Sequence, residues 1–103
     1  MNIQFKKGVL ELCVLSMLAG GDRYGYELAS SLSDRIHISD GTIYPILRRL
    51  RSDGFVTTFL EESSGGPPRK YYRLTRAGLE EQRRLREEWD EFAASVGRVI
   101  AGG

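Results

Sequence analysis

The sequence is poor in the residues from which enzymes build active sites. Its 103 residues include one cysteine, Cys13, and one histidine, His37. A single cysteine permits no internal disulfide, and one cysteine with one histidine forms neither a metal-ligand cluster nor a nucleophile–base pair. A glycine-rich phosphate loop is also missing. The sequence therefore argues against an enzyme, and we expect no metal and no cofactor. Cys13, in an apolar segment, is expected to be a small core residue.

An excess of one charge and a long apolar run are missing as well. The formal net charge is +1, with 28% charged and 41% hydrophobic residues, a composition typical of one soluble globular domain. The longest apolar segment, Phe5 to Leu18, contains Lys6, Lys7 and Glu11. This segment is too short and too charged for a membrane span or a secretory leader. We expect a cytoplasmic protein without membrane contact.

Residues 39–54 have the pattern of one amphipathic helix. Ser39 suits the N-cap, where its hydroxyl can accept a hydrogen bond from a first-turn amide, and Gly54 suits the left-handed residue that closes a helix. One apolar face recurs at steps of three and four residues: Ile43, Ile46, Leu47 and Leu50. The opposite face is small at its start and cationic at its end, which suits the major groove of DNA. The candidate DNA contacts on this helix are Ser39, Gly41, Thr42, Tyr44, Pro45, Arg48 and Arg51.

An ordinary amphipathic helix with solvated arginines would look similar, but the next segment favours DNA binding. Residues 55–60 and 69–74 are rich in β-branched and aromatic side chains, and a Ser-Gly-Pro cluster separates them. This order predicts a β-hairpin, although the sequence leaves open which of its faces points inward. Arg69 and Lys70 follow the tip and suit contacts with phosphates. A helix followed by such a hairpin is typical of a winged helix-turn-helix.

Three stretches also resemble a known family. Residues 41–50 (GTIYPILRRL) and 69–78 (RKYYRLTRAG) closely resemble the two signature stretches of the PadR family of bacterial transcriptional regulators, and residues 24–28 (YGYEL) are similar to a third. The resemblance covers nearly the whole chain, in the right order and spacing. It implies a homodimeric winged-helix repressor that a small molecule or another signal releases from its operator.

Two helices are expected before residue 39. The first spans Phe5 to Leu18 and is apolar nearly all round, so part of it is expected to meet another subunit. The second spans Arg23 to Ser33 with Asp22 as its cap, and residues 34–38 form the connection that follows. His37 lies in this connection and is expected to be structural, with a phosphate contact as its one candidate function.

The last helix is expected to begin after the cap residue Thr75 and to reach about Ile100. From Leu85 onward its apolar residues have the a/d spacing of a coiled-coil seam. Such a helix is about 39 Å long, which is more than a domain of this size can cover. Its far half is therefore expected to pair with a second copy, the alternative being a helix folded back on its own domain. The candidate dimer interface comprises Leu85, Trp89, Phe92, Val96 and Val99.

The same helix carries the candidate effector site. In some short members of the family that the chain resembles, a tryptophan in the corresponding helix stacks on a flat aromatic or multidrug ligand at the dimer interface. The resemblance implies an effector pocket lined by Leu12, Leu15, Trp89 and Phe92. A tryptophan on a dimer seam is, however, most often interface packing, and the sequence names no ligand.

The sequence thus predicts a mainly α protein with a small β-hairpin. Residues 1–74 form the winged helix-turn-helix DNA-binding domain and residues 75–103 the C-terminal dimerisation helix, in one compact unit. The predicted function is a sequence-specific, double-stranded-DNA-binding transcriptional regulator, as a homodimeric repressor on an inverted-repeat operator. A winged helix that binds another protein is the alternative, and the near-neutral charge favours it. The polar outward face opposes it, because protein-binding helices more often expose apolar anchors.

Overall fold

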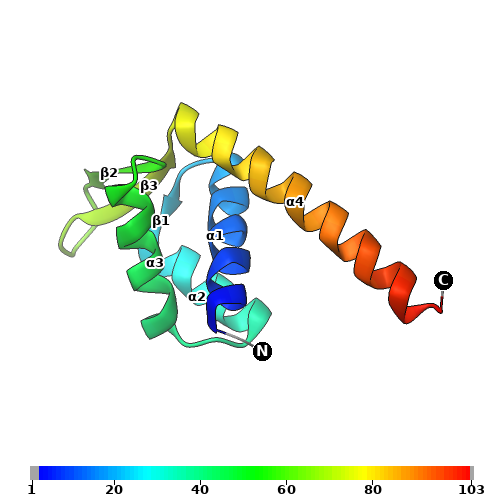
Figure 1. The fold of residues 1–103 in the computed structure, drawn as a ribbon. Helices are drawn as coiled ribbons and strands as arrows, with labels where there is room; N and C mark the ends of the chain where they lie inside the picture. The colour runs from blue at the N-terminus through cyan, green and yellow to red at the C-terminus, as the bar shows by residue number, and fades with distance from the viewer. Residues whose placement is uncertain (1–2, 103) are drawn as a thin grey trace.

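The computed structural model describes the backbone of residues 3–102 and the side chains of residues 7–102. The elements follow in the order α1 (Ile3–Ala19), β1 (Arg23–Tyr24), α2 (Gly25–Ile36), α3 (Asp40–Ser52), β2 (Val56–Glu61), β3 (Arg69–Leu74) and α4 (Arg76–Ile100). Figure 1 shows α1 at the centre, with α3 and the hairpin on one side and the end of α4 leaving on the other. The fold is a winged helix-turn-helix with a long C-terminal helix, as predicted.

The core is built around α1, which contacts α2, α3, α4 and β3. Val14 and Leu15 of this helix are completely buried. The buried apolar cluster comprises Leu10, Val14, Leu15, Leu18, Leu28, Ala29, Leu32, Ile43, Ile46, Leu47, Leu50, Val56 and Tyr72. It includes the whole predicted apolar face of α3, so that prediction is confirmed. Burial of each large side chain contributes about 1.5–3 kcal/mol to folding.

The hairpin belongs to a three-stranded antiparallel sheet in the order β1-β3-β2. Arg23 and Tyr24 form its third strand and pair with Tyr72 and Tyr71 of β3. The predicted start of the second helix at Arg23 with Asp22 as its cap was therefore wrong. Pairing with β3 holds these residues in an extended conformation, and α2 begins only at Gly25.

The end of α2 also differs from the prediction. Residues 34–36, expected in the connection, are helical, and the helix closes at His37. This residue has a left-handed φ of 55°, and its amide donates a hydrogen bond to the Ser33 carbonyl. His37 therefore forms the turn that joins α2 to α3, a conformation in which histidine is enriched among non-glycine residues.

The register of β2 and β3 shows which side of the hairpin points inward. Val56 pairs with Leu74 and packs with Tyr72 against the helices. On the opposite side Phe59 pairs with Tyr71, and their rings stack with centroids 5.5 Å apart. Each strand thus alternates between a buried and a partly exposed side, as antiparallel strands on a core do.

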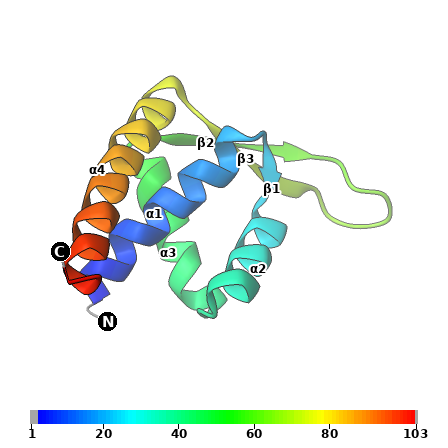
Figure 2. The same ribbon diagram turned by 90° about the vertical axis from the view of Figure 1, so that its right-hand side faces the viewer.

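The start of α4 is tightly joined to the rest of the chain. The Thr75 hydroxyl accepts from the Gly78 amide at 3.0 Å, which confirms the predicted cap, and donates to the Gly54 carbonyl at 2.7 Å. One turn later, the Gln82 side-chain amide donates to the Ser16 hydroxyl of α1 at 3.2 Å. Figure 2 shows this half of α4 lying along α1.

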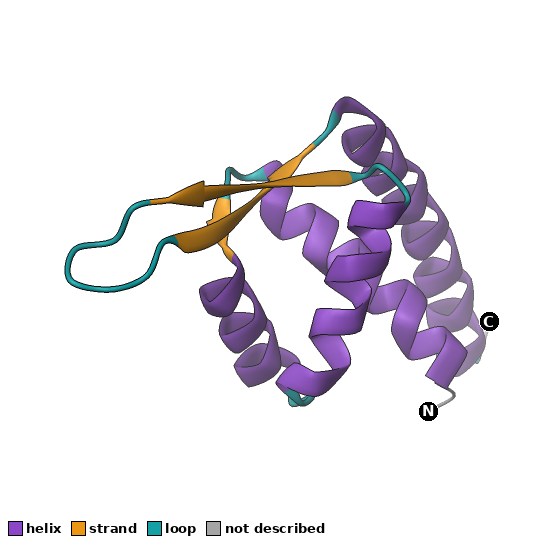
Figure 3. Cartoon of the chain, turned by 90° about the vertical axis from the view of Figure 1, so that its left-hand side faces the viewer, coloured by secondary structure: helices purple, strands orange, loops and turns teal. Residues whose placement is uncertain are grey.

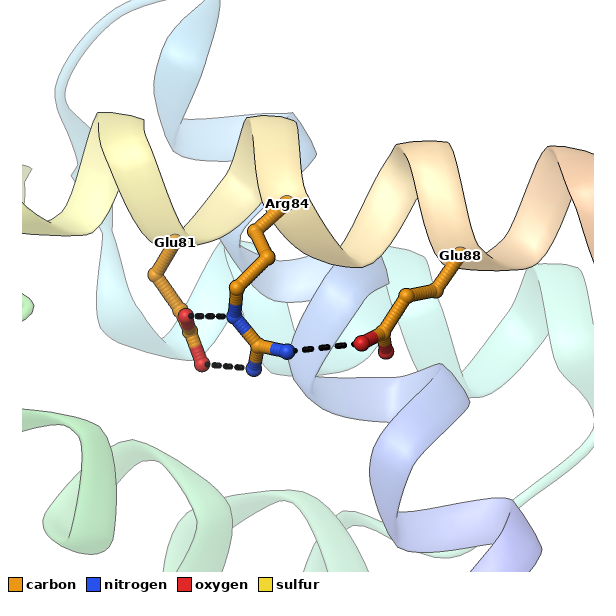
Figure 4. Close-up of polar contacts among 3 residues, drawn as sticks. All are labelled: Glu81, Arg84 and Glu88. Carbon is orange, nitrogen blue, oxygen red and sulfur yellow. Dashed lines mark hydrogen bonds and ion pairs between the residues drawn. The ribbon is translucent and has the colours of Figure 1, made fainter.

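The far half of α4 projects beyond the helical body (Figure 1). Trp89 and Phe92 are 40% and 53% exposed, so the helix does not fold back to bury them. Charges on α4 pair along the helix itself. Arg84 donates to Glu81 and to Glu88, at 2.8 Å each (Figure 4).

The close approach of Gly78 to Phe55 makes stability sensitive to this glycine. A Cβ at residue 78 would lie 2.0 Å from the Phe55 carbonyl oxygen. We expect Gly78→Ala to lower the free energy of unfolding by roughly 1–3 kcal/mol or more, because backbone must move. Urea denaturation at a fixed protein concentration measures the change. Gly41→Ala is the control, since its Cβ would meet only the Ser39 hydroxyl at 3.8 Å. Equal stability of the two variants would contradict this explanation.

Candidate nucleic-acid interface

The two ends of α3, the candidate recognition helix, have different hydrogen-bond patterns. At its C-terminal end Gly54 adopts a φ of +82°, and the amides of Gly54 and Phe55 donate to the carbonyls of Arg51 and Leu50. This is the expected left-handed closure. At its start Ser39 is the N-cap residue, but its hydroxyl makes no capping hydrogen bond. That part of the prediction was wrong, because the Ser39 hydroxyl pairs instead with the Thr42 hydroxyl at 3.1 Å.

The outward face of α3 is polar and accessible. Tyr44 is half-buried, and the other predicted contacts on this helix are exposed: Ser39, Gly41, Thr42, Pro45, Arg48 and Arg51. Pro45 is the sixth helical residue and has no amide to donate to the Gly41 carbonyl. The exposed start of α3 therefore offers hydroxyls and a carbonyl, that of Gly41, without its usual i+4 amide donor.

The cations of α3 differ in what they contact. Within the described part of the chain, neither Arg48 nor Arg51 forms an ion pair, whereas Arg49 lies 3.9 Å from Glu11 and 3.8 Å from Asp53. Arg48 and Arg51 are thus available to an external anion. Arg49 instead joins α3 to α1.

The wing, defined as β2, β3 and the loop between them, extends beyond the helices next to α3 (Figure 3). Lys70 is exposed at the start of β3 and has no ion pair among residues 7–102. The Arg69 guanidinium lies over the Tyr24 ring, 4.9 Å from its centroid. Successive side chains of a strand point to opposite faces, so Lys70 lies on the same side of β3 as the buried Tyr72, and Arg69 lies on the outer side with Tyr24 and Tyr71.

Arg73 fixes the base of the wing. Its guanidinium donates to both carboxylate oxygens of Asp22, the shortest contact being 2.7 Å. It also lies over the Phe59 ring, 4.7 Å from its centroid. The hydrogen bond to Asp22 raises the pKa of Arg73. This cation therefore joins the wing to the segment before β1.

A hollow between α3 and the base of the wing was missed by sequence reasoning. Its volume is about 230 Å³, and we call it the tyrosine hollow; it is lined by Tyr24, Gly25, Tyr26, Tyr44, Arg48, Lys70 and Tyr72. Four of the five tyrosines in the sequence line it. The YGYEL stretch carried two of them, but nothing local in the sequence places that stretch against α3 and β3.

Burial and charge define the chemistry of this hollow. Desolvation raises the pKa of Tyr44 and, against the opposing effect of Arg51 and Arg48, that of Tyr72. Both hydroxyls therefore stay protonated at neutral pH and able to donate. Tyr26 is 60% exposed. A larger residue in place of Gly25 would displace the Tyr72 ring, because its Cβ would lie 2.7 Å from that ring.

The candidate dimer and effector residues lie far from this face. A second hollow of about 240 Å³, here called the α1–α4 hollow, is lined by Gly8, Val9, Leu12, Leu85, Glu88, Trp89 and Phe92. It contains three of the predicted effector residues, Leu12, Trp89 and Phe92. Leu15 does not line it, because this side chain is completely buried in the core. None of the described helices is long and apolar enough to cross a membrane.

Comparison with known proteins agrees with a winged-helix regulator. A family model for PadR-like transcriptional regulators matches residues 14–87. The chain belongs to the PadR-like family of transcriptional regulators, and it is a regulator and not an enzyme.

Individual relatives cover nearly the whole chain. The transcriptional regulator Rv3488 of Mycobacterium tuberculosis is 35% identical over 97% of this chain and 90% of its own. The crystal structure of a PadR-like transcriptional regulator from Bacillus cereus matches with a TM-score of 0.85 and 36% identity, over 97% of this chain and 99% of that one. A PadR family regulator from Eggerthella lenta matches with a TM-score of 0.77 and 37% identity, over 95% and 87% of the two chains.

Proposed function

We propose that the protein binds double-stranded DNA in a sequence-specific manner, with α3 in the major groove and the wing beside it. The observation that carries this proposal is the common face shared by the polar start of α3, Lys70, and the two arginines that form no ion pair with another described residue. Arg48, midway along α3, suits a guanine edge, which it can contact through two hydrogen bonds. Arg51, Arg69 and Lys70 suit backbone phosphates, which set orientation more than specificity.

The start of α3 supplies the remaining contacts. The N-terminal residues of a recognition helix are those that approach base edges. Ser39, Thr42 and Tyr44 offer hydroxyl groups there. Gly41 and Pro45 leave the backbone of this turn accessible, because one has no side chain and the other makes no hydrogen bond to the turn before it. These residues therefore complete the proposed interface.

The exposed apolar side of α4 supports a homodimer formed through this helix as part of the proposal. Leu85, Trp89, Phe92, Val96 and Val99 lie along one side of α4, and from Trp89 onward this side is exposed. The helix extends beyond its own domain, so these apolar side chains are most simply buried by packing against α4 of a second copy. Two recognition helices related by a two-fold axis fit half-sites about 34 Å apart. The operator is therefore an inverted repeat, on which the dimer acts as a repressor.

Release by a small aromatic effector is the last part of the proposal. The α1–α4 hollow combines the Trp89 and Phe92 rings with the aliphatic Leu12, a lining that suits a flat apolar ligand. Glu88 supplies one charged group at its edge. A ligand seated there would contact both α1, on which α3 packs, and the proposed dimer seam.

Substitution of the two kinds of cation tests DNA binding. A tagged copy first selects its operator from a random duplex pool. Arg48→Ala is expected to weaken operator binding by about 1–3 kcal/mol and to relax specificity at one position. Lys70→Ala is expected to weaken all sequences alike and to lower the slope of log affinity against log salt by about 1.

Arg86→Ala is the matched control, because this arginine lies on α4 within 3.9 Å of Asp90. The same titrations separate DNA binding from a winged helix that binds protein. DNA affinity falls steeply with salt, since contacted phosphates release counterions. A response to salt that is flat, or identical for the Arg48 and Lys70 variants, would contradict the proposed contacts.

Sedimentation equilibrium tests the dimer. Val96→Glu is expected to shift the protein to monomers, because a carboxylate would be buried in the apolar seam. Ala94→Glu places the same group on the opposite side of α4 and is expected to leave the dimer intact. A wild type that is already monomeric, or a Val96→Glu variant as dimeric as the wild type, argues against the seam.

Fluorescence of Trp89, the single tryptophan, tests the effector site. Acridine, a planar aromatic probe, is expected to quench it saturably in the absence of DNA. Leu12→Ala should weaken this binding by roughly 1–2 kcal/mol through lost apolar contact. Leu60→Ala, on the exposed wing, should not. Quenching that grows linearly without saturation would show collision with an exposed ring and no site.

A further inference from the structure

The tyrosine hollow joins three segments that are far apart in the sequence. Tyr26 comes from the start of α2, Arg48 from α3 and Lys70 from β3. Lys70 and Arg48 have no carboxylate partner among the residues that the structure describes. Two unpaired cations at one hollow repel each other unless an anion lies between them. The hollow thus has the charge of an anion site.

We propose that the tyrosine hollow binds one backbone phosphate in each operator half-site, with the Tyr26 hydroxyl and the Lys70 ammonium as donors. This inference rests on the proposed DNA binding and adds Tyr26, at the start of α2, to the proposed contact residues. A phosphate oxygen accepts hydrogen bonds from hydroxyl, ammonium and guanidinium groups, and bonds to charged acceptors are the stronger ones. The hollow presents all three kinds of donor.

The surroundings of the hollow favour a phosphate over a base. Its lining includes four tyrosine rings, whose apolar surface makes the attraction between Lys70 and an anion stronger than in open water. Arg51 and Arg48 add positive potential, which is felt at Tyr72, and Asp40 acts in the opposite sense near Tyr44. A base would have to leave the duplex stack to enter, whereas phosphates already lie on the DNA surface.

The position of the hollow agrees with this role. It lies between α3, which is proposed to enter the groove, and the wing, which is proposed to lie beside it. The sugar-phosphate strand that borders the groove must pass between these two elements. A phosphate in the hollow would therefore connect α2, α3 and β3 through one group of the DNA.

The test combines Tyr26→Phe with single methylphosphonate substitutions in the selected operator duplex. Tyr26→Phe keeps the ring and removes only the hydroxyl of an exposed side chain, so an unchanged melting temperature is expected. Wild-type protein is expected to lose about tenfold in affinity when the one contacted phosphate of a half-site is neutralised. Tyr26→Phe is expected to bind the unmodified duplex about tenfold more weakly and to lose a smaller factor than the wild type from that one substitution, because only Lys70 then contacts the phosphate.

Tyr71→Phe is the matched control, because this tyrosine stacks on Phe59 outside the hollow and should behave as wild type. If Tyr26→Phe has wild-type affinity and the wild-type methylphosphonate profile, the inference is overturned while DNA binding stands. If inorganic phosphate raises the melting temperature of the wild type and Tyr26→Phe leaves DNA affinity unchanged, the hollow takes free phosphate and the inference is again overturned. A wild type that selects no duplex overturns the proposed function itself.

Discussion

Burial of α1 is the interaction on which the rest of the structure depends. Val14 and Leu15 have no exposed surface, and α1 contacts every other helix and β3. The inner face of α3 packs into the same core, so the opposite face of α3 has to point outward. The first half of α4 lies on α1 as well, where the Gln82–Ser16 hydrogen bond sets its position. One apolar helix therefore determines both where the polar face of α3 points and where the exposed end of α4 leaves the domain.

Charge is separated between these two regions, which explains how a chain of net charge +1 can present a cationic face. On α4 the opposite charges neutralise one another locally. The Arg84 hydrogen bond lowers the pKa of Glu81, and Arg86 lies 3.9 Å from Asp90. On the side of α3 and the wing, the described part of the chain leaves Arg48, Arg51 and Lys70 without such partners. Local potential, and not the sum over the chain, steers a charged partner.

The sequence was most informative where a signal is local and repeated. The apolar period of α3, the closing Gly54 and the Thr75 cap all depend on neighbours within a few residues, and the structure agrees with each. The strand β1 could not be predicted in this way. It has two residues, too few for a period, and its partner β3 lies far along the chain. The sequence could not show that Leu15 is buried and outside the pocket, because α1 is apolar on nearly every side and no period marks its buried face.

The same limit applies to the candidate site. The residues of α3 and of the wing could be proposed from their own segments, since each segment carries its own pattern. Tyr26 could not, because its proposed role depends on a hollow that exists only after α2, α3 and β3 have packed together. The Ser39 hydroxyl shows that a prediction from neighbouring residues can also fail. The sequence allowed a capping bond, but the nearby Thr42 hydroxyl offers a competing partner.

Contacts with the rest of the chain are distributed unevenly along the wing, and this bears on which of its residues can contribute to specific binding. At the base, β1 pairing, the contact of Arg73 with Asp22 and Phe59, and the fit of Gly25 against Tyr72 hold β3 in place relative to α3. In the loop of residues 62–68, the hydrogen bond from the Ser63 hydroxyl to the Pro67 carbonyl is a contact within the loop itself. A side chain held in place loses little entropy on binding, whereas a mobile one must first be ordered. Lys70 precedes Tyr71, which pairs with β1, and is therefore better placed to contribute affinity than any residue of the loop.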